Sequence, residues 1–175
     1  TGYYKNDAAT ADVLRDGWLH SGDAGYFTAD GQLVVIDRLK DVMHLADGTR
    51  FSPQFIENKL KFSPYVKEAV VIGDGRERIT ALINIDMPIV GKWAEKQRIG
   101  YTTYTDLSSK PEVYGLIEGE VRRVNRDLAK INATAVISKF VLLYKELDAD
   151  DDELTRTKKV RRGFIGERYR DVIEA

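Results

Sequence analysis

Two β-rich segments separated by a charged turn constrain the fold of this chain more than any other feature. Residues 66–72 (VKEAVVI) and 79–85 (ITALINI) are rich in branched aliphatic side chains, which favour extended backbone and pack well on a sheet. The turn between them, GDGRER at 73–78, combines two glycines with four charged residues. This composition is typical of a surface connection, so we predict two strands joined by a turn.

Helical patterns alternate with these strands along the chain. Ser52 and Pro53 have the residue types of an N-cap and a first helical position, which predicts a helix over about 53–62. Apolar residues at helical spacing predict a long amphipathic helix over 111–128. The interleaving of helices and strands indicates an α+β or α/β fold with a small sheet. Further along we predict a helix over 88–98, a polar loop over 101–110, a strand over 140–144 and a last helix from about 161.

The first fifty residues favour short strands. A helix over 8–15 and a strand over 18–20 precede two hairpins. The first hairpin turns at Ala29-Asp30-Gly31, and the second turns at Asp47-Gly48.

Composition excludes several classes of protein. The 27 basic and 28 acidic residues give a net charge of −1, which argues against a dedicated nucleic-acid binder. The absence of cysteine excludes disulfides, thiolate metal sites and cysteine nucleophiles, and two histidines argue against a His-rich metal site. No apolar run has the length of a membrane span, and the first residues lack the pattern of a signal peptide. We expect a soluble, cytoplasmic protein, and the start at Thr1 suggests a piece of a longer one.

The stretch GWLHSGDAGYF at 17–27 places the carboxylate of Asp23 between Gly22 and Gly25. Such a carboxylate can close an Asx turn or accept hydrogen bonds from a ligand. Two other stretches, 38–53 and 153–164, carry basic residues on predicted loops, and basic loops suit phosphate or carboxylate ligands.

Three motifs in order, GWLHSGDAGYFTADGQLVVIDRLKD, ADGTRFSPQFIEN and ELTRTKKVRR, resemble the C-terminal part of AMP-forming acyl-CoA synthetases. The resemblance covers essentially the whole chain. The long insert over 88–128 and the form TRTKKVRR are most similar to the long-chain fatty acid–CoA ligase branch. The resemblance implies an α+β fold, in which a small mixed sheet flanked by helices and a two-stranded hairpin follows the β-rich tail of a larger N-terminal domain.

The resemblance also implies a reaction in two steps. A fatty acid carboxylate attacks the α-phosphate of ATP and gives acyl-AMP and pyrophosphate. The C-terminal domain then turns, and the thiol of CoA attacks the acyl-AMP.

By the same resemblance, three residues near the start of the chain have a role: two bind the nucleotide, and the third lies at a hinge. Asp23 matches the acid that accepts hydrogen bonds from the ribose hydroxyls, and Arg38 matches an arginine that contacts the ribose or phosphate. Lys40 falls at the hinge about which the domain turns. From the residues alone, the alternatives are an Asx turn for Asp23, a strand-end charge for Arg38 and an ordinary exposed lysine for Lys40.

The second hairpin matches the loop that enters the active site in the thioester step. Gly48 would let the CoA pantetheine pass close to the backbone, and Arg50 would contact the nucleotide. The alternative is a simple Asp-Gly turn. Glu57, in the helix that follows, matches a family acid to which we assign a structural role.

Lys159 matches the lysine that bridges the substrate carboxylate and the nucleotide during adenylation. An ammonium on a flexible stem lowers the repulsion between two anions that must approach each other. Lys158 is the adjacent alternative, and a solvated basic run before a helix is the alternative for both. Arg161 and Arg162 are weaker candidates for contacts with the CoA phosphates.

We therefore predict that residues 1–37 are the tail of the N-terminal domain and residues 38–175 the mobile C-terminal domain. The cofactors would be ATP, CoA and Mg²⁺, held mainly by the N-terminal domain, with a fatty acid as substrate. The chain alone is expected to be inactive. Its partner is its own N-terminal domain; we predict no nucleic acid and no transmembrane segment, and peripheral membrane contact stays open.

Two alternatives remain at this point. One is a ligase of the same superfamily that uses another carboxylic acid or an acyl carrier protein acceptor. The other is a non-catalytic interaction domain that binds an acidic partner through the basic residues 156–162.

Overall fold

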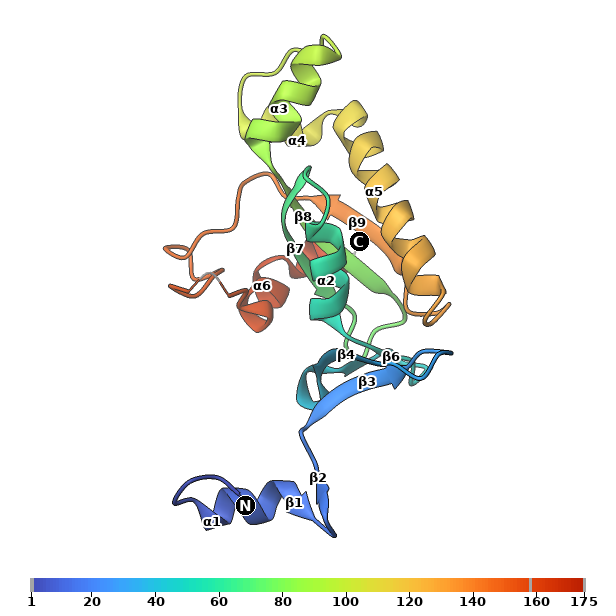
Figure 1. Cartoon of the computed structure of the whole chain (residues 1–175). Coiled ribbons are helices and arrows are strands. Elements are labelled where there is room, and N and C mark those ends of the chain that lie inside the picture. The colour runs from blue at the N-terminus through green and yellow to red at the C-terminus, as the bar shows by residue number, and fades with distance from the viewer. Residues whose placement is uncertain (1, 158, 175) are drawn as a thin grey trace. The chain divides into compact units, whose positions relative to one another are not determined.

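The computed structural model describes residues 2–157 and 159–174 (Figure 1). The chain divides into two compact units, Thr1–Val42 (unit 1) and Met43–Ala175 (unit 2). Lys158 lies outside the described residues.

The described residues of unit 1 form a short α-helix, two small hairpins and a 3₁₀ helix. The Asn6 side chain accepts a hydrogen bond from the Ala9 N–H (3.0 Å) and caps the helix. The predicted helix over 8–15 ends earlier than expected, because Leu14 and Arg15 pair with Leu19 and Trp18. The elements are α1 (Asp7–Val13), β1 (Leu14–Arg15), β2 (Trp18–Leu19), β3 (Asp23–Phe27), β4 (Leu33–Arg38) and the 3₁₀ helix η1 (Leu39–Asp41).

Large apolar side chains of unit 1 are exposed. Trp18 and Phe27 have 76% and 72% of their surface accessible, and Tyr4 has 87%. The described residues of unit 1 therefore bury little apolar area of their own.

Unit 2 is organised around a mixed sheet. Its described residues form a sheet in the order β7 (Val66–Ile72), β8 (Ile79–Ile85) and β9 (Ile137–Leu142). Strand β8 pairs antiparallel with β7 and parallel with β9. The two strands predicted from the β-rich segments are confirmed, and so is the small mixed sheet.

Strand β9 begins three residues earlier than the predicted strand over 140–144. Ile137 pairs with Ile79 at the start of the parallel ladder. The Asn125 side chain accepts from the Ile137 N–H (2.9 Å) and donates to its carbonyl (2.8 Å). This side-chain clamp fixes the beginning of the strand, and no local pattern in the sequence reveals it.

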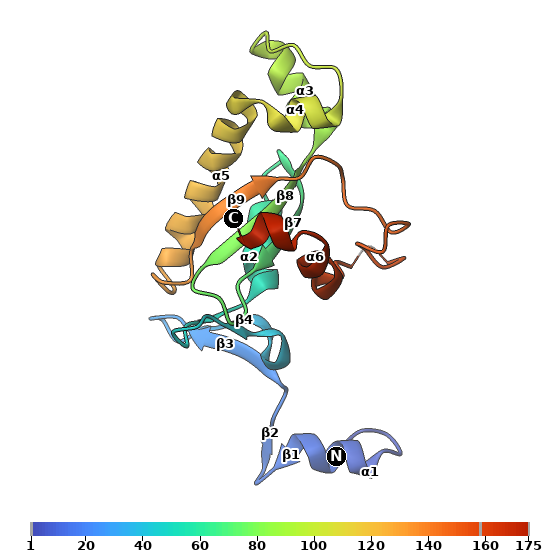
Figure 2. The same ribbon diagram turned by 180° about the vertical axis from the view of Figure 1, so that it is seen from behind.

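Helices cover both faces of the sheet, as Figures 1 and 2 show from opposite sides. Helices α2 (Pro53–Lys61) and α5 (Pro111–Ala129) pack on one face, where Ala69 and Val71 of β7 point. Helix α6 (Arg162–Arg168), with α7 (Arg170–Glu174) after it, packs on the other face against Val70, Ile72 and Leu82. Successive side chains of β7 point to opposite faces of the sheet, so the strand contributes to an apolar cluster on each face.

The helix predicted over 111–128 is confirmed. Its buried residues are Val113, Ile117, Val121, Val124 and Leu128, which lie on one face at helical spacing. The helix predicted at 53–62 is also confirmed, with the Ser52 hydroxyl accepting from the Phe55 N–H (3.0 Å).

A polar loop was expected between the two later helices, but it contains a helix. Helix α3 (Met87–Lys96) is followed by α4 (Tyr104–Ser109). The Thr103 hydroxyl caps α4 by accepting from the Asp106 N–H (3.1 Å), and Leu107 is fully buried. A single aliphatic residue in this segment is too weak a signal to predict a helix.

Strands β5 (Met43–His44) and β6 (Arg50–Phe51) form the predicted second hairpin of the chain. Among the described residues, no helix is both long and apolar enough to cross a membrane.

Candidate functional site

The carboxylate of Asp23 and the guanidinium of Arg38 lie together in unit 1. Asp23 opens β3, Arg38 closes β4, and the two are paired across the hairpin. Arg38 Nη1 lies 3.1 Å from Asp23 Oδ1 and donates to the Ser21 carbonyl at 3.1 Å. Both side chains keep access to solvent, at 60% for Arg38 and 33% for Asp23. The pair thus presents one acceptor and several donors to a ligand.

Glycines shape the backbone around this pair. Gly22 has a φ of +73°, a conformation that favours glycine. A Cβ on Gly25 would lie 2.5 Å from the Val34 carbonyl oxygen, where a bulge shifts the register of the hairpin. Gly25 therefore allows the backbones of β3 and β4 to approach closely at this bulge.

A shallow pocket adjoins the pair. Its volume is about 690 Å³, and it is lined by Gly22, Arg38, Leu39, Lys40 and Asp41. The structure thus brings together the three candidates of unit 1, because Lys40 lines the pocket beside Arg38 and Arg38 pairs with Asp23.

Gly48 lies at the turn between β5 and β6. Its φ is +84°, and its N–H donates to the Leu45 carbonyl (2.9 Å). A Cβ on Gly48 would meet no atom within 4 Å, so space is open beside this backbone. The Thr49 N–H donates to Asp47 Oδ1 (2.8 Å) and lowers the pKa of Asp47. The segment therefore forms an Asp-Gly turn, and no other atom crowds the backbone at Gly48.

The base of this hairpin is fixed by backbone contacts with the turn after β7. The Ala46 N–H donates to the Arg76 carbonyl and the Gly75 N–H to the His44 carbonyl, both at 2.8 Å. Arg50, on β6, is exposed.

Lys159 lies in a small loop that we call the Lys159 loop, residues 154–160. Leu154 and Val160 form a β-bridge at its base. The Thr155 N–H donates to the Lys159 carbonyl (2.8 Å), and the Lys159 N–H donates to the Thr155 hydroxyl (2.9 Å). The backbone N–H and carbonyl of Lys159 are thus both hydrogen-bonded, while the Lys159 side chain is exposed.

The structure separates the members of the basic run. Arg161 pairs with Asp152, and Arg162 pairs with the buried Glu57. Among the described residues, no carboxylate lies within ion-pairing distance of the Lys159 ammonium. Lys159 is therefore available to an anionic ligand, whereas Arg162 is engaged inside the fold.

Glu57 lies under the start of α6. Its side chain is 7% exposed and accepts from the Val71 N–H (2.8 Å) and from Arg162. The Nε of Arg162 donates to the Val71 carbonyl (3.2 Å). These contacts fit the structural role expected for Glu57, and they engage the Arg162 guanidinium with Glu57 and the Val71 carbonyl.

A buried polar network surrounds Glu153, and no motif of the sequence predicted it. This carboxylate closes the acidic run DADDDE but is 0% exposed. It accepts from Lys145 Nζ (2.9 Å) and from the Tyr169 hydroxyl (2.8 Å). Burial, together with this bond to Glu153, raises the pKa of Tyr169. All the acidic residues of this run have the composition of a solvated loop, so only the fold shows that Glu153 is buried.

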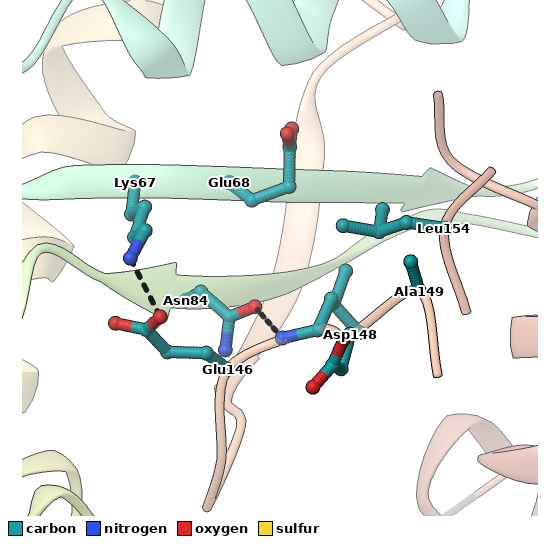
Figure 3. A pocket seen from close by; sticks show the side chains of 8 residues that line it. Lys67, Glu68, Asn84, Glu146, Asp148, Ala149 and Leu154 are labelled. Atoms are coloured by element: carbon teal, nitrogen blue, oxygen red, sulfur yellow. Dashed lines mark hydrogen bonds and ion pairs between the residues drawn. The ribbon is translucent and has the colours of Figure 1, made fainter. Parts of the chain in front are cut away.

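Asn84 is a second buried polar residue that the sequence did not reveal. Its side chain is hydrogen-bonded to the Lys145 carbonyl (2.6 Å) and to the Leu147 N–H (2.9 Å). It lines a pocket of about 490 Å³ beside the Lys67–Glu146 ion pair, as Figure 3 shows. The segment after β9 is thereby attached to β8.

Residues 40–175 match the family model described as AMP-binding enzyme C-terminal domain. The chain belongs to this family. It is the C-terminal portion of an adenylate-forming enzyme, as the motifs predicted.

Curated relatives of this C-terminal domain are fatty-acid–CoA ligases. The long-chain-fatty-acid–CoA ligase FadD15 of Mycobacterium tuberculosis is 34% identical over 100% of the chain, which spans 29% of that protein. The putative fatty-acid–CoA ligase fadD11 of the same species is 36% identical over 99% of the chain, which spans 30% of it. The chain therefore corresponds to less than a third of these relatives.

Solved structures share its fold. The adenylation domain of the carboxylate reductase from Mycobacterium chelonae has a TM-score of 0.63 at 23% identity, over 99% of the chain and 25% of that structure. MatB from Rhodopseudomonas palustris has a TM-score of 0.61 at 22% identity, over 98% of the chain and 28% of that structure. The predicted α+β fold of this superfamily is thus confirmed.

Proposed function

We propose that this C-terminal domain works in an ATP-dependent fatty acid–CoA ligase. In the first step a fatty acid carboxylate oxygen bonds to the α-phosphorus of ATP, and pyrophosphate leaves. In the second step the CoA thiol, losing its proton, bonds to the acyl carbon, and AMP leaves. The likeness of the whole chain to fatty-acid–CoA ligases supports this substrate class.

The observation that carries the proposal is the exposed side chain of Lys159, whose own backbone N–H and carbonyl are both hydrogen-bonded to Thr155. In the first step, two anions must come into contact. A cation that bridges the fatty acid carboxylate and the α-phosphate lowers their repulsion and orients both. Lys159 suits this role because no carboxylate of the described residues pairs with it.

In this proposal Asp23 and Arg38 bind the nucleotide. The Asp23 carboxylate accepts hydrogen bonds from the ribose hydroxyls, and such charge-assisted bonds are about twice as strong as neutral ones. Arg38 contacts the ribose or phosphate while it holds Asp23 at 3.1 Å. Arg50 is a further nucleotide contact.

The second step requires another face of the domain. We propose that torsions near Lys40 turn the domain, and that the Gly48 turn then lies beside the CoA pantetheine. The left-handed φ and the open space at Gly48 support this role. Residues 1–37 would belong to the N-terminal domain and residues 38–175 to the mobile one.

The remaining parts of the active site would come from the N-terminal domain. That domain would hold most of ATP, the Mg²⁺ ion and the acyl chain, and CoA would bind between the domains. The chain alone is therefore expected to catalyse neither step.

The test uses the full-length enzyme with Lys159→Ala and, as a matched control, Arg156→Ala, which removes another exposed cation of the same loop. We expect Lys159→Ala to slow pyrophosphate release with fatty acids by about 10²–10³-fold. Conversion of preformed acyl-AMP to thioester by CoA should be kept. Arg156→Ala should change both rates by less than about threefold.

If both steps survive in Lys159→Ala, Lys159 is a surface charge and Lys158 becomes the candidate. A panel of carboxylic acids, with CoA and acyl carrier protein as acceptors, tests the substrate class in the same assay. Pyrophosphate release with an unrelated acid alone would overturn the fatty acid assignment.

A further inference from the structure

We propose that Glu153 is a positioning residue for adenylation, because its buried carboxylate fixes the loop that presents Lys159. This inference rests on the proposed function of Lys159. It concerns a residue that does not touch the substrate and acts through the backbone that carries the lysine.

Glu153 is linked to three segments of unit 2. Its Oε2 accepts from Lys145 Nζ (2.9 Å) and from the Asp148 N–H (3.1 Å). Its Oε1 accepts from the Tyr169 hydroxyl (2.8 Å) and lies 3.5 Å from Arg168 Nε. The carboxylate therefore connects the segment after β9, the acidic loop and the end of α6.

The backbone of Glu153 is continuous with the base of the Lys159 loop. The Arg161 N–H donates to the Glu153 carbonyl (2.9 Å), directly below the Leu154–Val160 bridge. From this base, the pair of bonds between Thr155 and Lys159 closes the loop. A shift of Glu153 would therefore move both ends of the loop together.

Electrostatics makes Glu153 a firm anchor. A carboxylate that is 0% exposed is costly unless cations and donors surround it. Burial alone would lower the pKa of Lys145, but its hydrogen bonds to Asp151 and Glu153 outweigh this effect and raise it. The ion pair and hydrogen bonds thus leave Glu153 few alternative positions.

The consequence for catalysis is geometric. The flexible stem of Lys159 can reach its two anions only if its Cα is held in place. Displacement of a catalytic group by about 1 Å can cost about 10²-fold in rate. The adenylation step should therefore depend on Glu153, whereas the thioester step, which does not use Lys159, should not.

The test compares Glu153→Gln with Asp151→Asn in the full-length enzyme. Asp151 pairs with the same Lys145 but its side chain is 46% exposed, so its variant is the matched control. For Glu153→Gln we expect kcat of pyrophosphate release to fall about 10–100-fold. The thioester rate from preformed acyl-AMP should stay within about threefold. Asp151→Asn should leave both rates near those of the wild type.

Trypsin provides a readout that is independent of activity. Cleavage after the basic residues of the Lys159 loop should be faster in Glu153→Gln than in the wild type or Asp151→Asn, because a loosened loop is more accessible. Circular dichroism at the assay temperature shows whether each variant is folded. If Glu153→Gln does not fold, Tyr169→Phe removes one donor to the same carboxylate and should give a smaller loss in the same step.

Three outcomes separate the hypotheses. Selective loss of pyrophosphate release with faster loop cleavage supports the positioning role. Equal loss of both steps, or no loss in Glu153→Gln while Lys159→Ala loses the first step, overturns it and leaves the proposed function standing. If Lys159→Ala itself is fully active, the proposed role of Lys159 fails first, and the positioning inference fails with it.

Discussion

Replacing Arg162 by alanine should destabilise the chain far more than replacing its neighbour Arg161. Arg162 pairs with Glu57, and the two side chains are 27% and 7% exposed. Loss of one partner of a buried ion pair costs about 3–5 kcal/mol. Because solvent reaches part of the guanidinium, we expect about 2–3 kcal/mol for Arg162→Ala.

Arg161→Ala is the control because the ion pair that it removes is on the surface. Arg161 and Asp152 are 45% and 68% exposed, and surface pairs contribute about 0–1 kcal/mol. The guanidinium also lies 5.6 Å from the Phe164 ring, which at an exposed site adds about 0.5 kcal/mol. The control should therefore lose less than about 1.5 kcal/mol.

Urea unfolding followed by circular dichroism measures both free energies. For a chain of 175 residues, a loss of 2–3 kcal/mol corresponds to a fall in Tm of about 5–10 °C. Adding Glu57→Gln to Arg162→Ala should restore part of the loss, because a neutral amide leaves no unpaired charge. Equal losses in the two arginine variants, or no recovery in the double variant, would refute the assignment of Glu57 and Arg162 as a buried pair.

Two further predictions concern a turn and a buried phenol. Gly48→Ala should lower the free energy of unfolding by about 1–2 kcal/mol, since the φ of +84° at Gly48 disfavours a side chain. It should also slow the thioester step. The control in urea unfolding and CoA assays is Gly100→Ala, because a Cβ at Gly100 would meet no atom within 4 Å. The Tyr104 hydroxyl accepts from the Ile85 N–H (3.2 Å) and the Asn84 amide (3.0 Å), and burial raises its pKa from 10.0 to about 12. Tyr104→Phe should therefore cost about 1 kcal/mol at neutral pH. The stabilisation by the neutral phenol is complete below pH 10 and is lost as the pH rises through about 12. The difference in unfolding free energy between wild type and Tyr104→Phe should therefore shrink over that range. A difference that grows with pH would contradict the assignment.

The fold could be predicted where local pattern and tertiary environment agree. The β-rich segments became β7 and β8 with the predicted bounds, and the periodicity over 111–128 became α5. Prediction failed where distant residues decide. The Asn125 side chain on α5 fixes the start of β9, and burial of Leu107 in the core stabilises a helix in an otherwise polar segment.

The candidate site shows the same division. Motif spacing identified Asp23 and Arg38 separately, but only the register of the hairpin shows that they form a pair. The structure distinguishes Lys159 from Arg162, because Arg162 forms an ion pair with the buried Glu57. Glu153 could not be found, because in sequence a buried acid at the end of an acidic run is indistinguishable from its solvated neighbours.

The parallel pairing of β9 with β8 also sets an order of assembly. Strands β7 and β8 are neighbours in sequence and can pair as soon as both are synthesised, whereas β9 must first close the long connection between Ile85 and Ile137. Everything after β9, including the loop that carries Lys159, can take its position only after that closure. During translation, the Lys159 loop should therefore become ordered only after β9 has been synthesised and has paired with β8.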